Sequence, residues 1–151
     1  MRKGSGSEHA TAVLIGARAL LIRGPSGAGK SRLAWSLLDA AARRDIRFAR
    51  LVADDRVALS MLNGRLIAAA PKAIEGMIEL RGIGIRRVPF EPYAAVGMVA
   101  DLDAEDAERV PAPAAFRCEI LGVTLPRLPL ASGADPLPHI LENWRELGFS
   151  A

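Results

Sequence analysis

The sequence contains a single cysteine and only seven aromatic residues among 151. Cys118 alone cannot form an internal disulfide or a zinc site built from several thiolates, which is typical of a protein kept in a reducing cytoplasm. No basic run is interleaved with aromatic residues, so the sequence predicts no nucleic-acid-binding surface. No stretch of 18 apolar residues lacks a charge, which excludes a helix that spans a bilayer. We therefore expect a cytoplasmic protein with no membrane partner.

Two nucleotide-binding signatures are also missing. Lysine occurs only as Lys3, Lys30 and Lys72, and none of them belongs to the Asn-Lys-x-Asp motif with which GTPases recognise guanine. The Leu-Ser-Gly-Gly-Gln signature of ABC-type ATPases does not occur either. The chain therefore has neither the guanine-recognition motif of GTPases nor the signature of ABC-type ATPases. If it binds a nucleotide, these absences favour a reaction in which a phosphoryl group is transferred to an acceptor.

The composition is typical of one globular domain, with 50% hydrophobic and 25% charged residues. We expect residues 1–8 to be a flexible N-terminus and residues 9–151 to form a single domain. The first 100 residues hold 16 Lys or Arg against 8 Asp or Glu, which favours phosphate-bearing ligands or acidic partners. Arginine makes up 17 of the 20 basic residues, a bias that coding composition also produces.

Hydrophobic periodicity predicts alternating strands and a helix in the first half of the chain. Two short apolar strands joined by a tight connection precede the helix, and a buried strand and a second hairpin follow it. Asn63-Gly64 between the last two strands is a strong hairpin signal. The expected elements are strands at Thr11 to Ile15 and Ala19 to Ile22, a helix at Lys30 to Arg44, and strands at Phe48 to Ala53, Val57 to Leu62 and Arg65 to Ala69.

The second half of the chain has a less regular pattern. Glycines interrupt the apolar residues from Met77 to Val88, so a strand and a loop both remain open there. Strands are expected at Ala95 to Leu102 and at Glu119 to Leu125. Asp135-Pro136 is typical of a helix N-cap followed by proline in the first turn, which predicts a closing helix that ends near Leu147.

Residues 24–31, Gly-Pro-Ser-Gly-Ala-Gly-Lys-Ser, match the phosphate-loop pattern G-x-x-x-x-G-K-[ST] between a predicted strand and a predicted helix. The glycines allow successive backbone N–H groups to face an anion, and the helix N-terminus adds the positive end of its dipole. Lys30 is expected to reach the outer phosphates, and Ser31 is expected to bind Mg²⁺. The candidate nucleotide-binding residues are Gly24, Pro25, Ser26, Gly27, Ala28, Gly29, Lys30, Ser31 and Arg32.

Two adjacent carboxylates, Asp54 and Asp55, end the strand predicted after the helix. Phosphoryl transfer needs metal ions that neutralise developing charge and a carboxylate that accepts the hydroxyl proton, and this pair could divide the two tasks. Alone, such a pair is more often a solvated strand end, but the phosphate loop upstream favours the catalytic interpretation. Glu79 is a lone acid in an apolar stretch, either a metal ligand or a side chain that faces water.

Four segments, in order and well spaced, resemble the catalytic domain of bacterial HPr kinase/phosphorylase, the serine kinase of the phosphocarrier protein of the sugar phosphotransferase system. They are His9, the phosphate loop, Leu-Val-Ala-Asp-Asp-Arg-Val at 51–57, and Ile-Glu-Leu-Arg-Gly-Ile-Gly-Ile at 78–85, which is similar to the family signature L-E-I-R-G-L-G-I. The resemblance implies an α/β fold of the phosphoenolpyruvate carboxykinase type, with the phosphate-loop helix packed on a mixed sheet.

The resemblance also implies a protein-serine kinase that uses ATP and Mg²⁺. Asp54 corresponds to the catalytic acid/base, and His9 to the histidine that assists it. The other correspondences are Ser31 and Glu79 as Mg²⁺ ligands, Asp55 as the acidic neighbour of the catalytic group, and Arg81 as a contact to phosphate or to the acceptor. The implied partner is an HPr-like phosphocarrier, and the implied assembly is the family's homo-oligomer, a hexamer.

The chain departs from the family pattern in two respects. Full-length members carry an additional N-terminal domain that 151 residues cannot accommodate, so a short form is expected. Residues 128–135, Leu-Pro-Leu-Ala-Ser-Gly-Ala-Asp, stand where members have an Arg-containing P-V-R-P-G-R-N segment implicated in dephosphorylation. Both arginines are missing, which argues against phosphorylase activity.

The leading hypothesis is therefore a kinase that transfers the γ-phosphoryl group of ATP to a serine of an HPr-like phosphocarrier and so regulates carbohydrate or nitrogen metabolism. A small-molecule kinase with the same phosphate loop is the second hypothesis. The third is a nucleotide-sensing module without chemistry, which would keep Lys30 but have no need of Asp54.

Overall fold

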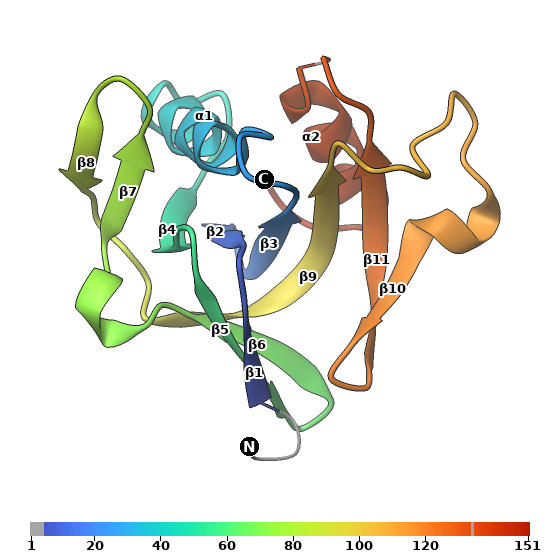
Figure 1. The fold of residues 1–151 in the computed structure, drawn as a ribbon, viewed down its shortest axis with the longest axis horizontal. Helices are drawn as coiled ribbons and strands as arrows, with labels where there is room; N and C mark the ends of the chain where they lie inside the picture. Colours follow the sequence, from blue (N-terminus) through green and yellow to red (C-terminus); the bar gives the residue numbers. More distant parts are fainter. Residues whose placement is uncertain (1–4, 134) are drawn as a thin grey trace.

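A strongly curled mixed sheet forms the body of the protein, and two helices lie along one of its faces (Figure 1). The computed structural model describes residues 5–133 and 135–151. The strands are β1 (Ser5–Glu8), β2 (Thr11–Ile15), β3 (Arg18–Arg23), β4 (Ala49–Ala53), β5 (Val57–Leu62), β6 (Arg65–Ala69), β7 (Met77–Leu80), β8 (Gly84–Arg87), β9 (Tyr93–Leu102), β10 (Arg117–Ile120) and β11 (Val123–Leu130). The helices are α1 (Lys30–Ala42) and α2 (Leu137–Glu146), and short 3-10 turns occupy Lys72–Ile74 and Pro113–Phe116.

Strand β9 connects the two halves of the sheet. Near its start it pairs antiparallel with β6, and over residues 96–102 it pairs in parallel with β3 and with β11. The order across the sheet is β1-β5-β6-β9-β3-β2-β4, with β11 on β9 and β10 on β11. Because β3 and β9 are parallel and β2 is antiparallel to both β3 and β4, the carboxyl ends of β3, β4, β9 and β11 lie at one edge.

The core has two clusters, one on each face of the central strands. Along β3, Leu20 and Ile22 pack with the helices, whereas Ala19 and Leu21 pack on the opposite face, as the two-residue period of a strand requires. All four are fully buried, which explains why this strand is a continuous apolar run. Helix α1 packs against β4 and β2 and leaves its N-terminus at the edge where β3 ends.

The predicted α/β fold with a mixed sheet and the phosphate-loop helix packed on it is confirmed. The β2–β3 hairpin, α1, β4 and the β5–β6 hairpin occur where expected, and Asn63 and Gly64 both have positive φ, as a type I′ turn requires. The open stretch from 77 to 88 is a two-stranded hairpin, β7–β8. The closing helix is confirmed as α2, and Asp135 Oδ1 accepts a hydrogen bond from Leu137 N at 3.2 Å.

Two expectations are wrong. Ser5–Glu8 is not a flexible end but strand β1, because its backbone pairs antiparallel with β5; residues 1–4 lie outside the described part of the chain. The single strand expected at Glu119 to Leu125 is two strands, β10 and β11, joined at Leu121 and Gly122. Both turn residues have positive φ, 51° and 79°, which reverses the chain direction there.

In the described residues, no helix is long and apolar enough to cross a membrane.

Candidate functional site

The phosphate loop, Gly24–Ser31, connects the end of β3 to the start of α1 and curls around the side chain of Lys30. Lys30 Nζ donates hydrogen bonds to the backbone oxygens of Gly24 at 2.7 Å and Pro25 at 3.2 Å. Gly27 and Gly29 have φ values of 83° and 100°, a region that favours glycine. The loop thus combines a buried ammonium group with a free helix N-terminus, an arrangement suited to a phosphate chain.

Gly24 is held closely between the loop and β9. A Cβ atom at this position would lie 3.1 Å from both Cβ and O of Leu102 and 3.3 Å from Cβ of Ala28. Any side chain would therefore push the loop away from the end of β9. The requirement for glycine at the first position of the motif is steric here.

Asp54, at the end of β4, is buried and accepts three hydrogen bonds. Its Oδ1 accepts from Ser31 Oγ at 2.6 Å and from Thr11 Oγ1 at 3.0 Å, and its Oδ2 accepts from the backbone N–H of Glu79 at 3.0 Å. One carboxylate thus connects α1, β2 and β7. It fixes the serine of the phosphate loop relative to the sheet.

Asp55 points away from this network and pairs with His9. Asp55 Oδ1 lies 2.7 Å from His9 Nε2, and the two side chains are 70% and 55% exposed. The backbone of Asp55 has φ 68°, a left-handed conformation that aspartate tolerates, and its N–H donates to Thr11 Oγ1 at 3.3 Å. His9 therefore contacts Asp55 and not Asp54, because this turn sends the two adjacent carboxylates in different directions.

Glu79 and Arg81 lie beside the loop on β7 and just after it. The side chain of Glu79 is exposed although its backbone binds Asp54. Arg81 is also exposed, and a Cβ atom built on Gly27 would lie 3.9 Å from Arg81 Nη2. The guanidinium group therefore lies over the phosphate loop. Arg32 is exposed in the first turn of α1.

Oxygen atoms around the phosphate loop fit a magnesium ion. Ser31 Oγ and the exposed Glu79 carboxylate offer the hard oxygen ligands that Mg²⁺ prefers, and the Asp54 carboxylate holds Ser31 Oγ at 2.6 Å. No group of three or more His, Cys, Asp or Glu side chains in residues 5–133 and 135–151 is arranged to hold a metal by itself. Phosphate oxygens and water molecules would supply the remaining ligands of such an ion, as is usual for Mg²⁺ beside nucleotides.

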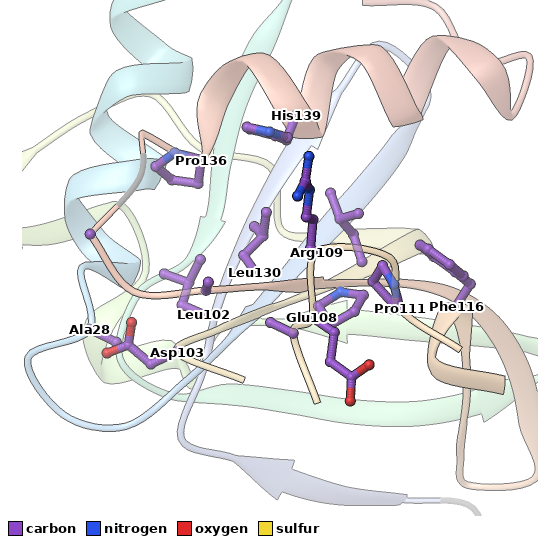
Figure 2. A pocket seen from close by; sticks show the side chains of 15 residues that line it. Ala28, Leu102, Asp103, Glu108, Arg109, Pro111, Phe116, Leu130, Pro136 and His139 are labelled. Atoms are coloured by element: carbon purple, nitrogen blue, oxygen red, sulfur yellow. The ribbon is translucent and has the colours of Figure 1, made fainter. Parts of the chain in front are cut away.

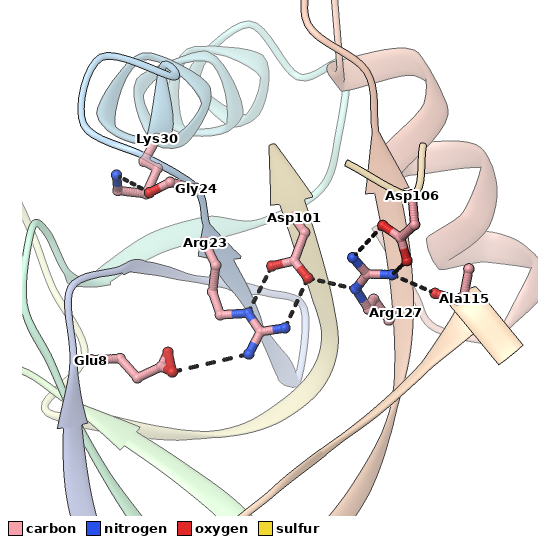
Figure 3. A network of polar contacts seen from close by, with 8 residues as sticks. All are labelled: Glu8, Arg23, Gly24, Lys30, Asp101, Asp106, Ala115 and Arg127. Atoms are coloured by element: carbon pink, nitrogen blue, oxygen red, sulfur yellow. Dashed lines mark hydrogen bonds and ion pairs between the residues drawn. The ribbon is translucent and has the colours of Figure 1, made fainter. Parts of the chain in front are cut away.

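A chain of ion pairs extends from the phosphate loop across β9 to β11 (Figure 3). Asp101 on β9 accepts hydrogen bonds from Arg23 at 2.7 and 2.8 Å and from Arg127 Nε at 2.5 Å. Burial alone would raise the pKa of Asp101, but the hydrogen bonds from both arginines outweigh burial and lower it. Arg127 also donates to both carboxylate oxygens of Asp106 and to Ala115 O at 2.9 Å.

A cavity of about 410 Å³ opens beside the phosphate loop at the ends of β9 and β11 (Figure 2). Its floor is apolar, and charged or polar side chains surround its mouth. Its lining includes Ala28 from the phosphate loop, Leu102 and Asp103 at the end of β9, Leu130 and Ala131 at the end of β11, and Pro136 and His139 near the start of α2.

Sequence reasoning missed three features of this region. Thr11 carries a buried hydroxyl that binds both acids, and no motif marks it in a strand of apolar neighbours. Asp101 and Arg127 are ordinary surface residue types in the sequence, and only the parallel pairing of distant strands joins them. The cavity has no sequence signal for the same reason.

The fold and site together define a phosphate-loop domain on a mixed sheet. The loop serine, Ser31, donates a hydrogen bond to Asp54 at the end of β4. A sequence profile of the family described as "HPr Serine kinase C-terminal domain" matches residues 4–91, more than half of the chain. The chain therefore belongs to this family.

Individual relatives agree with that assignment. The chain is 33% identical to an HPr kinase/phosphorylase from Geobacillus thermodenitrificans over 131 residues, which cover 80% of this chain and 40% of the relative. It is 41% identical to one from Clostridium tetani over 81 residues, covering 54% of this chain and 24% of the relative. The solved Hpr(Ser) kinase/phosphatase from Coxiella burnetii is similar with a TM-score of 0.73 and 25% identity, covering 93% of this chain and 88% of that chain. The chain thus spans less than half the length of these two curated relatives.

Proposed function

We propose that this domain transfers the γ-phosphoryl group of ATP to a serine of an HPr-like phosphocarrier protein. The observation that carries the proposal is the exposed Asp55–His9 pair beside a phosphate loop whose Ser31 is bound by Asp54. A phosphate loop alone would serve any nucleotide-binding protein. An accessible carboxylate next to it offers a base for an incoming hydroxyl group. Family membership supports the phosphocarrier as the acceptor.

The two acids divide the work differently from the sequence-based expectation. Asp54 is buried, and its oxygens are already occupied by three donors, so it is poorly placed to accept a proton from a protein substrate. Asp55 is exposed and has one side-chain partner in the described structure. We therefore assign the general base to Asp55 and a positioning role, through Ser31, to Asp54.

The transfer requires one bond to form and one to break. The serine oxygen of the acceptor attacks the γ-phosphorus, the bond from that phosphorus to the bridging oxygen breaks, and ADP leaves. Asp55 accepts the hydroxyl proton of the serine. His9 Nε2–H donates to Asp55 Oδ1 and holds the carboxylate in the orientation needed for that step.

Electrostatic stabilisation comes from the cations around the loop. Lys30 and the loop N–H groups would bind the phosphates, and Arg81, whose guanidinium lies near Gly27, would stabilise the charge that develops on the transferred group. When bound, Mg²⁺ supplies charge neutralisation of the phosphate oxygens. Ser31 and Glu79 would hold it, together with the water molecules that Asp54 can orient.

The decisive experiment is incubation of the purified protein with γ-labelled Mg-ATP and an HPr-type phosphocarrier from the same cell. We expect the label on a serine of the carrier. Asp55→Asn should lose transfer by a factor on the order of 10² to 10⁴ while ATP binding is retained. Asp45→Asn, which changes an exposed acid outside the site, is the matched control and should transfer normally.

The alternative functions give different outcomes in the same experiment. ATP consumption with a small molecule from cell extract, but no label on the carrier, would identify a small-molecule kinase. ATP binding without transfer to any acceptor would identify a nucleotide-sensing module. Full transfer by Asp55→Asn would overturn the assignment of the base while leaving the kinase in place.

The proposal also covers the direction of the phosphoryl transfer and the oligomeric state of the protein. Strand β11 ends at Leu130, and the sequence of residues 128–135 contains no arginine, so we propose a kinase without phosphorylase activity. Incubation of the phosphoserine product with inorganic phosphate tests this, and release of pyrophosphate would contradict it. The family resemblance supports a cytoplasmic homo-oligomer that regulates carbohydrate or nitrogen metabolism.

A further inference from the structure

We propose that the cavity beside Ala28 binds the nucleoside base of the triphosphate whose phosphates bind the phosphate loop. This inference rests on the proposed function, since it assumes that the loop holds a nucleoside triphosphate. It assigns a ligand to a part of the chain that lies beyond the family match, because every lining residue except Ala28 follows residue 91.

The order of the strands gives the direction in which the ligand lies. Strand β3 leads into the phosphate loop, and the acids that end β4 lie on one side of it, beyond β2. The ends of β9 and β11, which line the cavity, lie on the other side. A triphosphate with its γ-phosphoryl group at Asp55 therefore directs its nucleoside toward the cavity. Ligands of open α/β sheets commonly bind outside the carboxyl ends of parallel strands.

The chemistry of the lining suits a flat heteroaromatic ring. The apolar side chains of Leu102, Leu128 and Leu130 line the cavity, and Phe116 lies at one side of it (Figure 2). Polar groups are few and lie at the mouth, where Figure 2 shows Arg109 directed toward His139. A volume of about 410 Å³ lies within the range of roughly 300 to 1,000 Å³ that is typical of small-molecule sites.

The outer wall of the cavity is fixed by hydrogen bonds to β11. We call residues 103–116 the wall segment, since six of them line the cavity. Arg127 binds Asp106 and Ala115 O within this segment, and Ala104 N donates to Leu130 O at 3.0 Å. Asp101 links the same arginine to Arg23, the residue before the phosphate loop. The wall and the loop are thus held in one network, which presents a formed site to the base.

The test compares a nucleotide with its phosphates alone. Ala131 lines the cavity and is exposed, so Ala131→Trp fills the space without disturbing the core. Ser132→Trp, at the next residue, is exposed but does not line the cavity and is the matched control. Binding of ATP and of inorganic tripolyphosphate, both with Mg²⁺, is measured by calorimetry. We expect Ala131→Trp to weaken ATP binding at least tenfold with tripolyphosphate unchanged, and Ser132→Trp to leave both within twofold.

Other results overturn the inference and separate it from the proposed function. Equal ATP affinity in Ala131→Trp and the original protein would mean that the base lies elsewhere, and the kinase would stand if serine labelling persists. Equal loss of ATP and tripolyphosphate would mean that the substitution disturbs the phosphate loop rather than a base subsite. Failure of the original protein to bind either ligand would remove the proposed function together with the inference. Crosslinking by 8-azido-ATP provides a second readout, and label that lies neither on Ala28 nor within residues 102–139 would contradict the subsite.

Discussion

Asp101 is bound by Arg23 from one neighbouring strand and by Arg127 from the other, at 2.7 and 2.5 Å. Arg23 directly precedes the phosphate loop, and Arg127 holds the wall segment through Asp106. The side chains of Asp101 and Arg127 are only 14% and 13% exposed, so solvent screens this contact weakly. One carboxylate therefore couples the position of the loop to the position of the cavity wall.

Removal of Arg127 is expected to destabilise the protein. Arg127→Met should lower the free energy of unfolding by about 2 kcal/mol, less than the roughly 3–5 kcal/mol typical of a broken buried pair, because Arg23 still binds Asp101. Urea unfolding followed by circular dichroism measures the change. Arg117→Met, an exposed arginine on β10, is the control and should shift stability by less than about 0.5 kcal/mol. Equal effects of the two substitutions would show that the network contributes nothing.

Because the pKa of Asp101 is lowered in the folded chain, we expect the free energy of unfolding to depend on pH. The pKa of Asp101 is lower in the folded chain than in the unfolded chain, so the unfolded state binds more protons and stability rises with pH in this range. Its contribution is present above the unfolded pKa of about 4 and is lost as pH falls through the folded pKa. We expect Asp101→Asn to be less stable at pH 7 but to lose less stability between pH 5 and pH 3. Parallel stability curves for the two proteins would refute this coupling.

Thr11 is expected to matter for both stability and transfer. Its hydroxyl donates to Asp54 and accepts from the backbone N–H of Asp55, so Thr11→Val leaves two polar groups without this partner. The expected cost is about 1–3 kcal/mol of unfolding free energy. The turnover rate should also fall, because the orientation of both acids depends on this hydroxyl. Thr11→Ser keeps the hydroxyl and should restore turnover, whereas a turnover defect in Thr11→Ser equal to that in Thr11→Val would show that the hydroxyl does not orient the two acids.

His9 is predicted to act through Asp55 and not through nucleotide binding. His9→Ala should reduce the rate of phosphoryl transfer by about tenfold or more, because the Asp55 carboxylate loses its orienting donor. The dissociation constant for ATP should stay unchanged, since Lys30 and the loop are untouched. Single-turnover transfer and ATP titration separate the two quantities. A weaker affinity for ATP at an unchanged transfer rate would contradict the role.

The sequence predicted the local features of the fold well. The β5–β6 hairpin follows from Asn63-Gly64, and α1 follows from the apolar spacing after Lys30. Such features depend on residues close in sequence. Strand β1 was missed because Ser5–Glu8 has no apolar alternation, and its pairing with β5 supplies the order that its composition lacks.

The candidate site was predictable in its residues but not in their contacts. The phosphate loop, both acids and Glu79 lie together, as their motifs indicate. The direction in which each acid points depends on the positive φ of Asp55, for which the sequence offers only a weak preference. The cavity and the Asp101 network depend on β9 and β11 lying beside β3, a pairing between strands that are far apart in the chain.

The position of β9 between β3 and β11 has a consequence for synthesis of the chain. The segment that carries every recognisable motif ends at residue 91, before the strand that covers the open edge of β3. A nascent chain of that length would expose the unpaired backbone of β3, whose residues Ala19 to Ile22 are all apolar, and such an edge is a template for aggregation. Parallel pairing between such distant segments is also slow, because a long loop must close before any contact forms. The part of the chain after residue 91 thus completes the folding of the earlier part, and truncation near residue 91 should yield insoluble protein rather than a smaller working domain.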